Sequence, residues 1–125
     1  MVSSTTEVAS TFPSLGYDSR GQKFAVISVA ADEDSAALVA AVTGAKTRVL
    51  AVVATQAANA GGSMYFESGS TALTGDMKAI ATSNQIVMPF NPAGWFETAS
   101  GEALNLTTAG TGVYGCLVYE EVAGT

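Results

Sequence analysis

Hydrophobic and polar residues alternate along much of this chain, in short runs that end at Gly-, Asn- and Thr-rich turns. A repeat of two places successive side chains on opposite faces of a β-strand, so these runs predict strands and no long helix. The Ala-rich segment 35–42 also suits a helix, but the turn residues 43–46 that follow it favour a strand and a hairpin. About eight strands are expected, at 23–30, 35–42, 47–55, 63–68, 72–80, 85–90, 103–107 and 113–122.

The clearest local signal lies in residues 85–106, where two turns separate short strands. Asn91-Pro92-Ala93-Gly94 is a turn sequence, because Pro92 fixes φ and Gly94 readily adopts φ > 0. A second turn is expected at 99–102. The stretch therefore predicts strand, turn and strand, with Trp95 and Phe96 between the two turns.

The strands 23–30, 47–55 and 113–122 are apolar on both faces. In the most hydrophobic of them, the two faces are Val49, Ala51 and Val53 against Leu50, Val52 and Ala54. The partner sheet of a two-layer sandwich covers only one face of a strand. We therefore expect the second face to be covered by another subunit or by the N-terminal arm.

Together the strands predict an all-β protein, an antiparallel β-sandwich of about eight strands arranged as a jelly roll over residues 23–125. The segment 63–68 is expected to have one face in water. Its inward residues are Met64 and Phe66, and its outward residues are Ser63, Tyr65 and Glu67.

Residues 1–22 are rich in Ser and Thr and fit neither a helical nor a strand period. They predict an extended N-terminal arm that orders against a neighbouring subunit or a partner, or else a frayed terminus. The start of the chain lacks the pattern of a secretory signal, and no apolar run is long enough to span a membrane. The side chains expected to make the contacts of the arm are Val8, Phe12, Leu15 and Tyr17.

The composition favours a subunit of an assembly. Hydrophobic residues make up 48% of the chain and charged residues only 13%, against roughly 25% charged in an average soluble domain. A chain with so few charges is expected to bury much of its surface against other subunits. The net charge of −6 argues against direct binding of nucleic acid, which requires a basic surface.

The sequence offers no catalytic or metal-binding constellation. Histidine is absent and Cys116 is the single cysteine, which excludes His-dependent triads and thiolate clusters. Cys116 is expected to be a small buried hydrophobe. Glu97 and Glu102 resemble a glycosidase pair only in spacing, and strand-end glutamates in water are the commoner case. The acidic run 32–34 is interpreted as a solvated loop and not a calcium site, so we expect no enzyme and no cofactor.

The adjacent aromatic residues Trp95 and Phe96 have three interpretations. We favour a plug at the end of the sandwich core over a ligand platform, and an intersubunit anchor is the third possibility. The residues expected in the trimer interface or the core are Val49, Ala51, Val53, Trp95, Phe96, Leu117 and Tyr119.

Five segments between about Thr47 and Val122 form a recognisable set: K-x-R-V-L-A at 46–51, F-x-S-G-x-x-A-L-T-G at 66–75, P-F-N-P-A-G-W-F-E-T at 89–98, G-E-A-L-N-L at 101–106 and G-x-L-V-Y-x-E-V at 115–122. In these segments the chain resembles a family of small tailed-bacteriophage proteins, the jelly-roll head decoration (cement) proteins. Residues 1–46 do not carry this resemblance.

The resemblance implies a structural virion protein that is made in the bacterial cytoplasm and binds the outer capsid surface. Its partners would be the major capsid protein and two further copies of itself in a homotrimer, with no direct contact to nucleic acid or membrane. The alternatives are a trimeric receptor- or glycan-binding fibre-tip module and a tail or neck structural protein. Sequence alone does not separate these, because one fold serves many functions.

Overall fold

The structure of the protein is a computed structural model, and it describes residues 21–57, 61–80 and 84–124. Within these ranges the chain forms strands and no helix. In chain order the strands are β2 Gln22–Val29, β3 Ala36–Val39, β4 Ala45–Gln56, β5 Ser63–Ser68, β6 Thr71–Ala72, β7 Met77–Lys78, β8 Gln85–Met88, β9 Phe96–Glu97, β10 Leu104–Ala109 and β11 Val113–Ala123. Outside the described residues lie the arm side chains Val8, Phe12, Leu15 and Tyr17.

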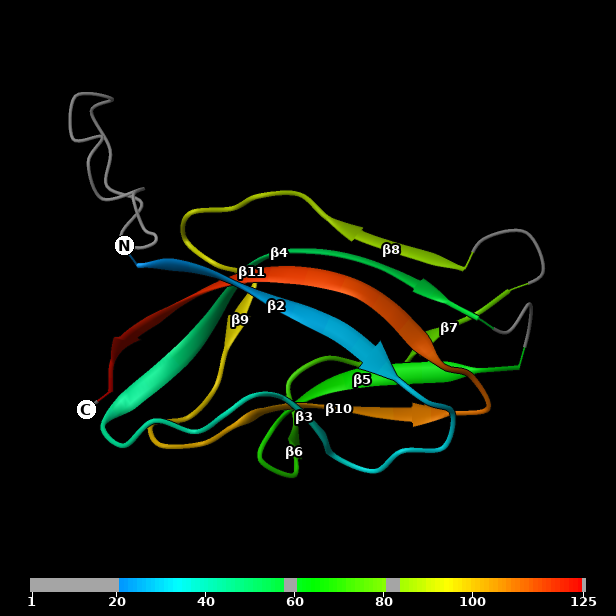
Figure 1. The fold of residues 1–125 in the computed structure, drawn as a ribbon, viewed down its shortest axis with the longest axis horizontal. Helices are drawn as coiled ribbons and strands as arrows, with labels where there is room; N and C mark the ends of the chain where they lie inside the picture. Colours follow the sequence, from blue (N-terminus) through cyan, green and yellow to red (C-terminus); the bar gives the residue numbers. More distant parts are fainter. Residues whose placement is uncertain (1–20, 58–60, 81–83, 125) are drawn as a thin grey trace.

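The strands form two antiparallel sheets of five strands each, counted over the described part of the chain. The first sheet has the order β2-β11-β4-β8 with β9 beside β4, and the second has the order β3-β10-β5-β6 with β7 beside β5. Figure 1 shows β2, β11, β4 and β8 above β3, β10, β5 and β6. The expected antiparallel β-sandwich is confirmed, and the narrower expectation of a jelly roll stays a prediction.

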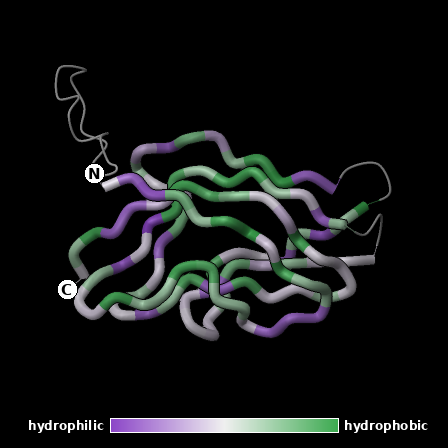
Figure 2. The backbone as a smooth tube through the Cα atoms, viewed as in Figure 1, coloured by the Kyte–Doolittle hydropathy of each residue, from purple (hydrophilic) through white to green (hydrophobic). Residues whose placement is uncertain are grey.

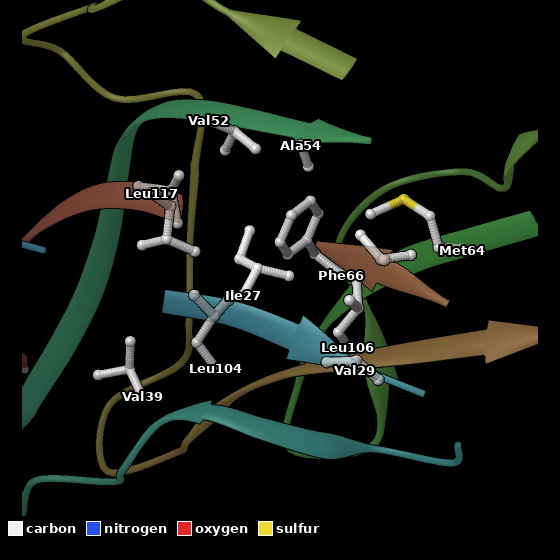
Figure 3. Packing of buried hydrophobic residues seen from close by; sticks show 12 residues of the cluster. Ile27, Val29, Val39, Val52, Ala54, Met64, Phe66, Leu104, Leu106 and Leu117 are labelled. Carbon is white, nitrogen blue, oxygen red and sulfur yellow. The ribbon is translucent and has the colours of Figure 1, made fainter. Parts of the chain in front are cut away.

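The hydrophobic core lies between the two sheets and takes side chains from both (Figure 3). Phe66 of β5 and Leu106 of β10 are fully buried, and they pack in one cluster with Ile27 and Leu117 of the first sheet. Phe96 of β9 contacts Phe66, with 5.1 Å between the ring centroids. Each of these large side chains contributes about 2 kcal/mol through burial. The predicted inward direction is confirmed for Met64 and Phe66, and Leu104 and Leu106 of β10 are buried in the same cluster.

A β-bulge in β4 changes which of its side chains face the core. Leu50 is an extra residue between two positions of β4 that pair with consecutive residues of β11. An extra residue shifts the alternation of a strand by one. Val49 therefore faces the core with Val52, and the expected grouping of Val49 with Ala51 and Val53 is wrong.

β3 is a strand, as expected, but it does not pair with the next strand in the chain. It pairs with β10 in the second sheet, whereas β4 pairs with β11 and β8 in the first. The chain crosses between the sheets after β3, so the hairpin predicted at 43–46 is wrong. Gly44 does turn the chain, with φ of 77°, but a local turn does not select a distant partner. The expected strand at 72–80 is broken into β6 and β7, which pair with opposite ends of β5.

Glu67 of β5 was expected to face water, and it is only 3% exposed. Its Oε1 atom accepts hydrogen bonds from Ser35 Oγ at 2.9 Å and from Thr107 Oγ1 at 2.6 Å. The loop before β3 lies against β10 at the same place, where Thr108 N donates to Glu33 O at 2.9 Å. A buried carboxylate requires such donors. The network fastens this loop over the second sheet and buries Glu67, whereas Ser63 and Tyr65 remain partly exposed.

Candidate interaction surface

The outer face of the first sheet is apolar and, among the residues that the structure describes, largely exposed. The pairing registers place side chains of β2, β11, β4 and β8 in rows that run across the sheet. One row is Val26, Cys116, Val53 and Val87, and the next is Phe24, Val118 and Ala51. We call these seven residues the apolar face. Figure 2 shows hydrophobic stretches, in green, along the strands of this sheet.

Four side chains of the apolar face are mostly exposed to solvent. Phe24 is 78% exposed, Val26 76%, Val87 62% and Val53 57%. Antiparallel sheets with one solvated face normally carry polar residues there. An apolar patch that continues across four strands is typical of a protein contact surface.

Ion pairs within the chain border the apolar face at one end. The next row contains Arg48, which lies 3.1 Å from Glu97 and 3.3 Å from Glu120, measured between nitrogen and carboxylate oxygen. Lys46 lies 3.3 Å from Glu97. The Arg48 hydrogen bond, helped by Lys46, holds the pKa of Glu97 below its ordinary value against the opposing effect of burial. These charges are already paired, so they do not require an ionic partner.

The opposite border of the apolar face is polar but uncharged. It consists of Ser28, Tyr114, Thr55 and Gln85, one from each strand. The exposed acids lie elsewhere: the run 32–34 lies in the loop before β3, Asp76 precedes β7 and Glu102 precedes β10. β3, β7 and β10 all belong to the second sheet. Among the described residues, the exposed acids thus lie away from the apolar face, and the charges that border it are paired with each other.

The structure divides the residues predicted for the trimer interface or core into separate groups. Val49 and Leu117 are buried in the core, and Phe96 and Tyr119 are partly buried against it. Ala51 and Val53 belong to the apolar face instead.

Two predictions of burial are wrong for the single chain. Trp95 is 46% exposed, whereas Phe96 packs against the core. Cys116 is exposed, because it alternates with the inward-facing Leu117.

Sequence reasoning did not single out Phe24, Val26 or Val87 as surface residues. Each lies in an expected strand, but the strands 23–30 and 85–90 were not known to flank the same sheet. Val26 and Val87 share a row with Val53, and Phe24 lies in the next row. These rows can be recognised only when the order of the strands in the sheet is known.

The candidate carboxylates for chemistry have structural partners. Glu97 forms the ion pairs described above, and Glu102 accepts a hydrogen bond from Ser68 Oγ. Among the described residues, no group of three or more His, Cys, Asp or Glu side chains is placed to hold a metal ion. The described segments also contain no helix that is long and apolar enough to cross a membrane.

Comparisons of the chain with protein-family models, with curated proteins and with solved structures find no match.

Proposed function

We propose that this chain is a structural virion protein: a capsid decoration, or cement, protein that binds the outside of a tailed-phage head as a homotrimer and stabilises the shell. The observation that carries the proposal is the apolar face. A chain of this kind is not an enzyme, and its partners are protein surfaces, namely copies of itself and the major capsid protein.

The occupant of the apolar face is a second copy of the chain. The face carries no charge, while the chain as a whole has a net charge of −6. Two copies therefore repel each other in most orientations and meet at least electrostatic cost through their uncharged faces. The ion pairs at the border are satisfied within each subunit, so the contact needs only apolar complementarity. Closed rotational symmetry then gives a finite ring, and we propose a ring of three.

The strand order supports the jelly-roll part of the proposal. In a jelly roll, two four-stranded sheets alternate along the chain, so that strands one, eight, three and six face strands two, seven, four and five. If β6 and β7 are counted as one interrupted strand and β8 and β9 as another, β2-β11-β4-β8 and β3-β10-β5-β6 follow this order.

Decoration would stabilise the shell by mass action. A protein that binds only the mature lattice lowers the free energy of that state by RT ln(1 + [L]/Kd) per site. The proposal retains a role for the arm, whose Val8, Phe12, Leu15 and Tyr17 would contact the capsid or a neighbouring subunit. Deleting residues 1–20 should leave a folded trimer that no longer co-sediments with capsids. Capsid binding by the truncated chain would contradict that role.

The experiment that tests the proposed function measures the mass of the purified chain by light scattering and then its co-sedimentation with capsids of the parent virus. A trimer that sediments with capsids supports the proposal. A stable monomer, or a trimer that remains in the supernatant, overturns it.

The exposure of Trp95 favours one second candidate, a glycan-binding module at the tip of a fibre. An exposed indole ring can stack on a sugar. A titration of the chain with host-surface glycans, followed by Trp95 fluorescence, separates this candidate from decoration.

A further inference from the structure

The loop between β8 and β9, Pro89–Trp95, is ordered by hydrogen bonds and carries aromatic side chains on its surface. We call it the aromatic loop. Asn91 N donates to Leu50 O at 2.9 Å and Trp95 N donates to Val49 O at 2.8 Å, so both ends of the loop are fastened to the edge of β4. The loop is therefore held in one conformation by the sheet.

The predicted turn at 91–94 is present inside this loop. Gly94 N donates to Asn91 O at 2.9 Å, and Gly94 has φ of 88°. The Asn91 side chain accepts from Ala93 N at 3.0 Å and donates to Gly94 O at 3.3 Å. Preorganisation of this kind lowers the entropy cost when a loop binds a partner.

Phe90 and Trp95 remain on the outside of this rigid loop, 53% and 46% exposed. The Trp95 indole Nε1 donates to Pro89 O at 2.8 Å, so its hydrogen-bonding capacity is used within the loop. The Arg48 side chain lies beside Gly94 of the loop, and it forms an ion pair with Glu97. The loop thus offers apolar contact and few free polar groups, which suits a hydrophobic pocket on a protein better than a sugar or a phosphate.

The aromatic loop lies at the end of the sandwich where β2 begins. Gln22, Glu120, Arg48 and Glu97 form one row across the sheet, and Glu97 lies just beyond the loop. Gln22 and Glu97 are three strand spacings apart, about 14 Å. Figure 1 shows the start of β2 and the coil that follows β8 at the same end of the molecule. This end lies one row beyond the apolar face.

We propose that the aromatic loop inserts Phe90 and Trp95 into an apolar pocket on the major capsid protein. The inference rests on the proposed function, in which the apolar face is covered by sister subunits and the ends of the sandwiches stay free. A trimer then presents three identical aromatic loops at one pole, beside the three points where the arms begin. Three linked contacts raise the affinity well above that of a single loop.

The test compares Phe90→Ser with a matched control, Ile80→Ser. Ile80 is 54% exposed, almost the same as Phe90, and it lies two residues after β7. Figure 1 shows β7 at the end of the sandwich opposite to the start of β2. The trimers of both variants, checked by light scattering, are titrated onto parent-virus capsids that lack the chain. Loss of an aromatic anchor is expected to weaken capsid binding roughly 30-fold or more. Ile80→Ser is expected to bind like the original chain.

A second variant, Trp95→Leu, removes the other aromatic side chain and should weaken capsid binding in the same direction. Trimeric Phe90→Ser and Trp95→Leu chains that bind capsids normally would overturn the assignment. So would a glycan that shifts Trp95 fluorescence and competes with capsids. If the original chain itself fails to bind capsids, the proposed function fails first, and the two failures are thereby distinguished.

Discussion

Val53 provides the sharpest test of the apolar face. It lies in β4, in the middle of the first sheet, and it is 57% exposed. Val53→Asp should convert the proposed trimer to a folded monomer. In the single subunit the new carboxylate points to water, and an exposed substitution usually changes stability by only about 0.5 kcal/mol. In an assembly it is buried without a partner.

The size of the effect follows from the exposure of Val53. Complete burial of a valine side chain is worth about 2 kcal/mol, so its exposed part represents roughly 1 kcal/mol per copy. An unpaired buried carboxylate adds several kcal/mol more. At roughly 4 kcal/mol per copy, a trimer loses about 12 kcal/mol, comparable to the free energy of a nanomolar contact.

The assay is the mass in solution over a range of concentrations, with Ala72→Asp as the control. Ala72 is an exposed residue of β6 in the other sheet, so that variant adds the same charge away from the apolar face. Cys116 gives a second signal as the single cysteine of the chain. A maleimide should label it slowly in the original assembly and rapidly in Val53→Asp. A variant with the original mass and a protected thiol would refute the assignment of the apolar face as a subunit contact.

Two further predictions concern stability. At Gly115 a Cβ atom would lie 2.0 Å from Val53 O and 2.7 Å from Ala54 Cα, so Gly115→Ala should force β11 away from β4 and cost about 3 kcal/mol or more; an unchanged urea midpoint would contradict this contact. The lowered pKa of Glu97 should contribute stability that is present above its ordinary value of 4.5 and is lost as the pH falls through the lower folded value. Because solvent screens this partly exposed group, the effect is small. Glu97→Gln should therefore slightly reduce the fall in melting temperature at acidic pH. A melting temperature that falls with pH as in the original chain would argue against the ion pairs.

The alternation of residues was enough to predict the strands and much of the core. Phe66 and Leu106 point inward as their periods require, and the turn at 91–94 forms where Pro92 and Gly94 favour it. These features depend on neighbours a few residues apart, which a sequence pattern records directly. The fold class was therefore predictable.

The errors arose where distant contacts decide the outcome. The bulge at Leu50 reverses the faces of β4, and nothing in its apolar run marks one residue as extra. Glu67 is buried because Ser35 and Thr107, remote in sequence, supply its donors. The sequence predicted single strands with two apolar faces, but not which of their residues lie side by side. The row that joins Val26 to Val87 can be recognised only when the strand order is known.

In the proposed trimer, the position of the exposed acids away from the apolar face also bears on how quickly free subunits find one another. Unassembled copies diffuse with their exposed acids on the second-sheet side and in its loops. Their repulsion extends over a Debye length of about 8 Å at physiological salt. Encounters that bring those sides together are rejected before contact, whereas encounters between uncharged faces proceed. The charge pattern thereby favours encounters in the productive orientation. This preference should weaken as salt is added, and it should affect the rate of assembly more than its final extent.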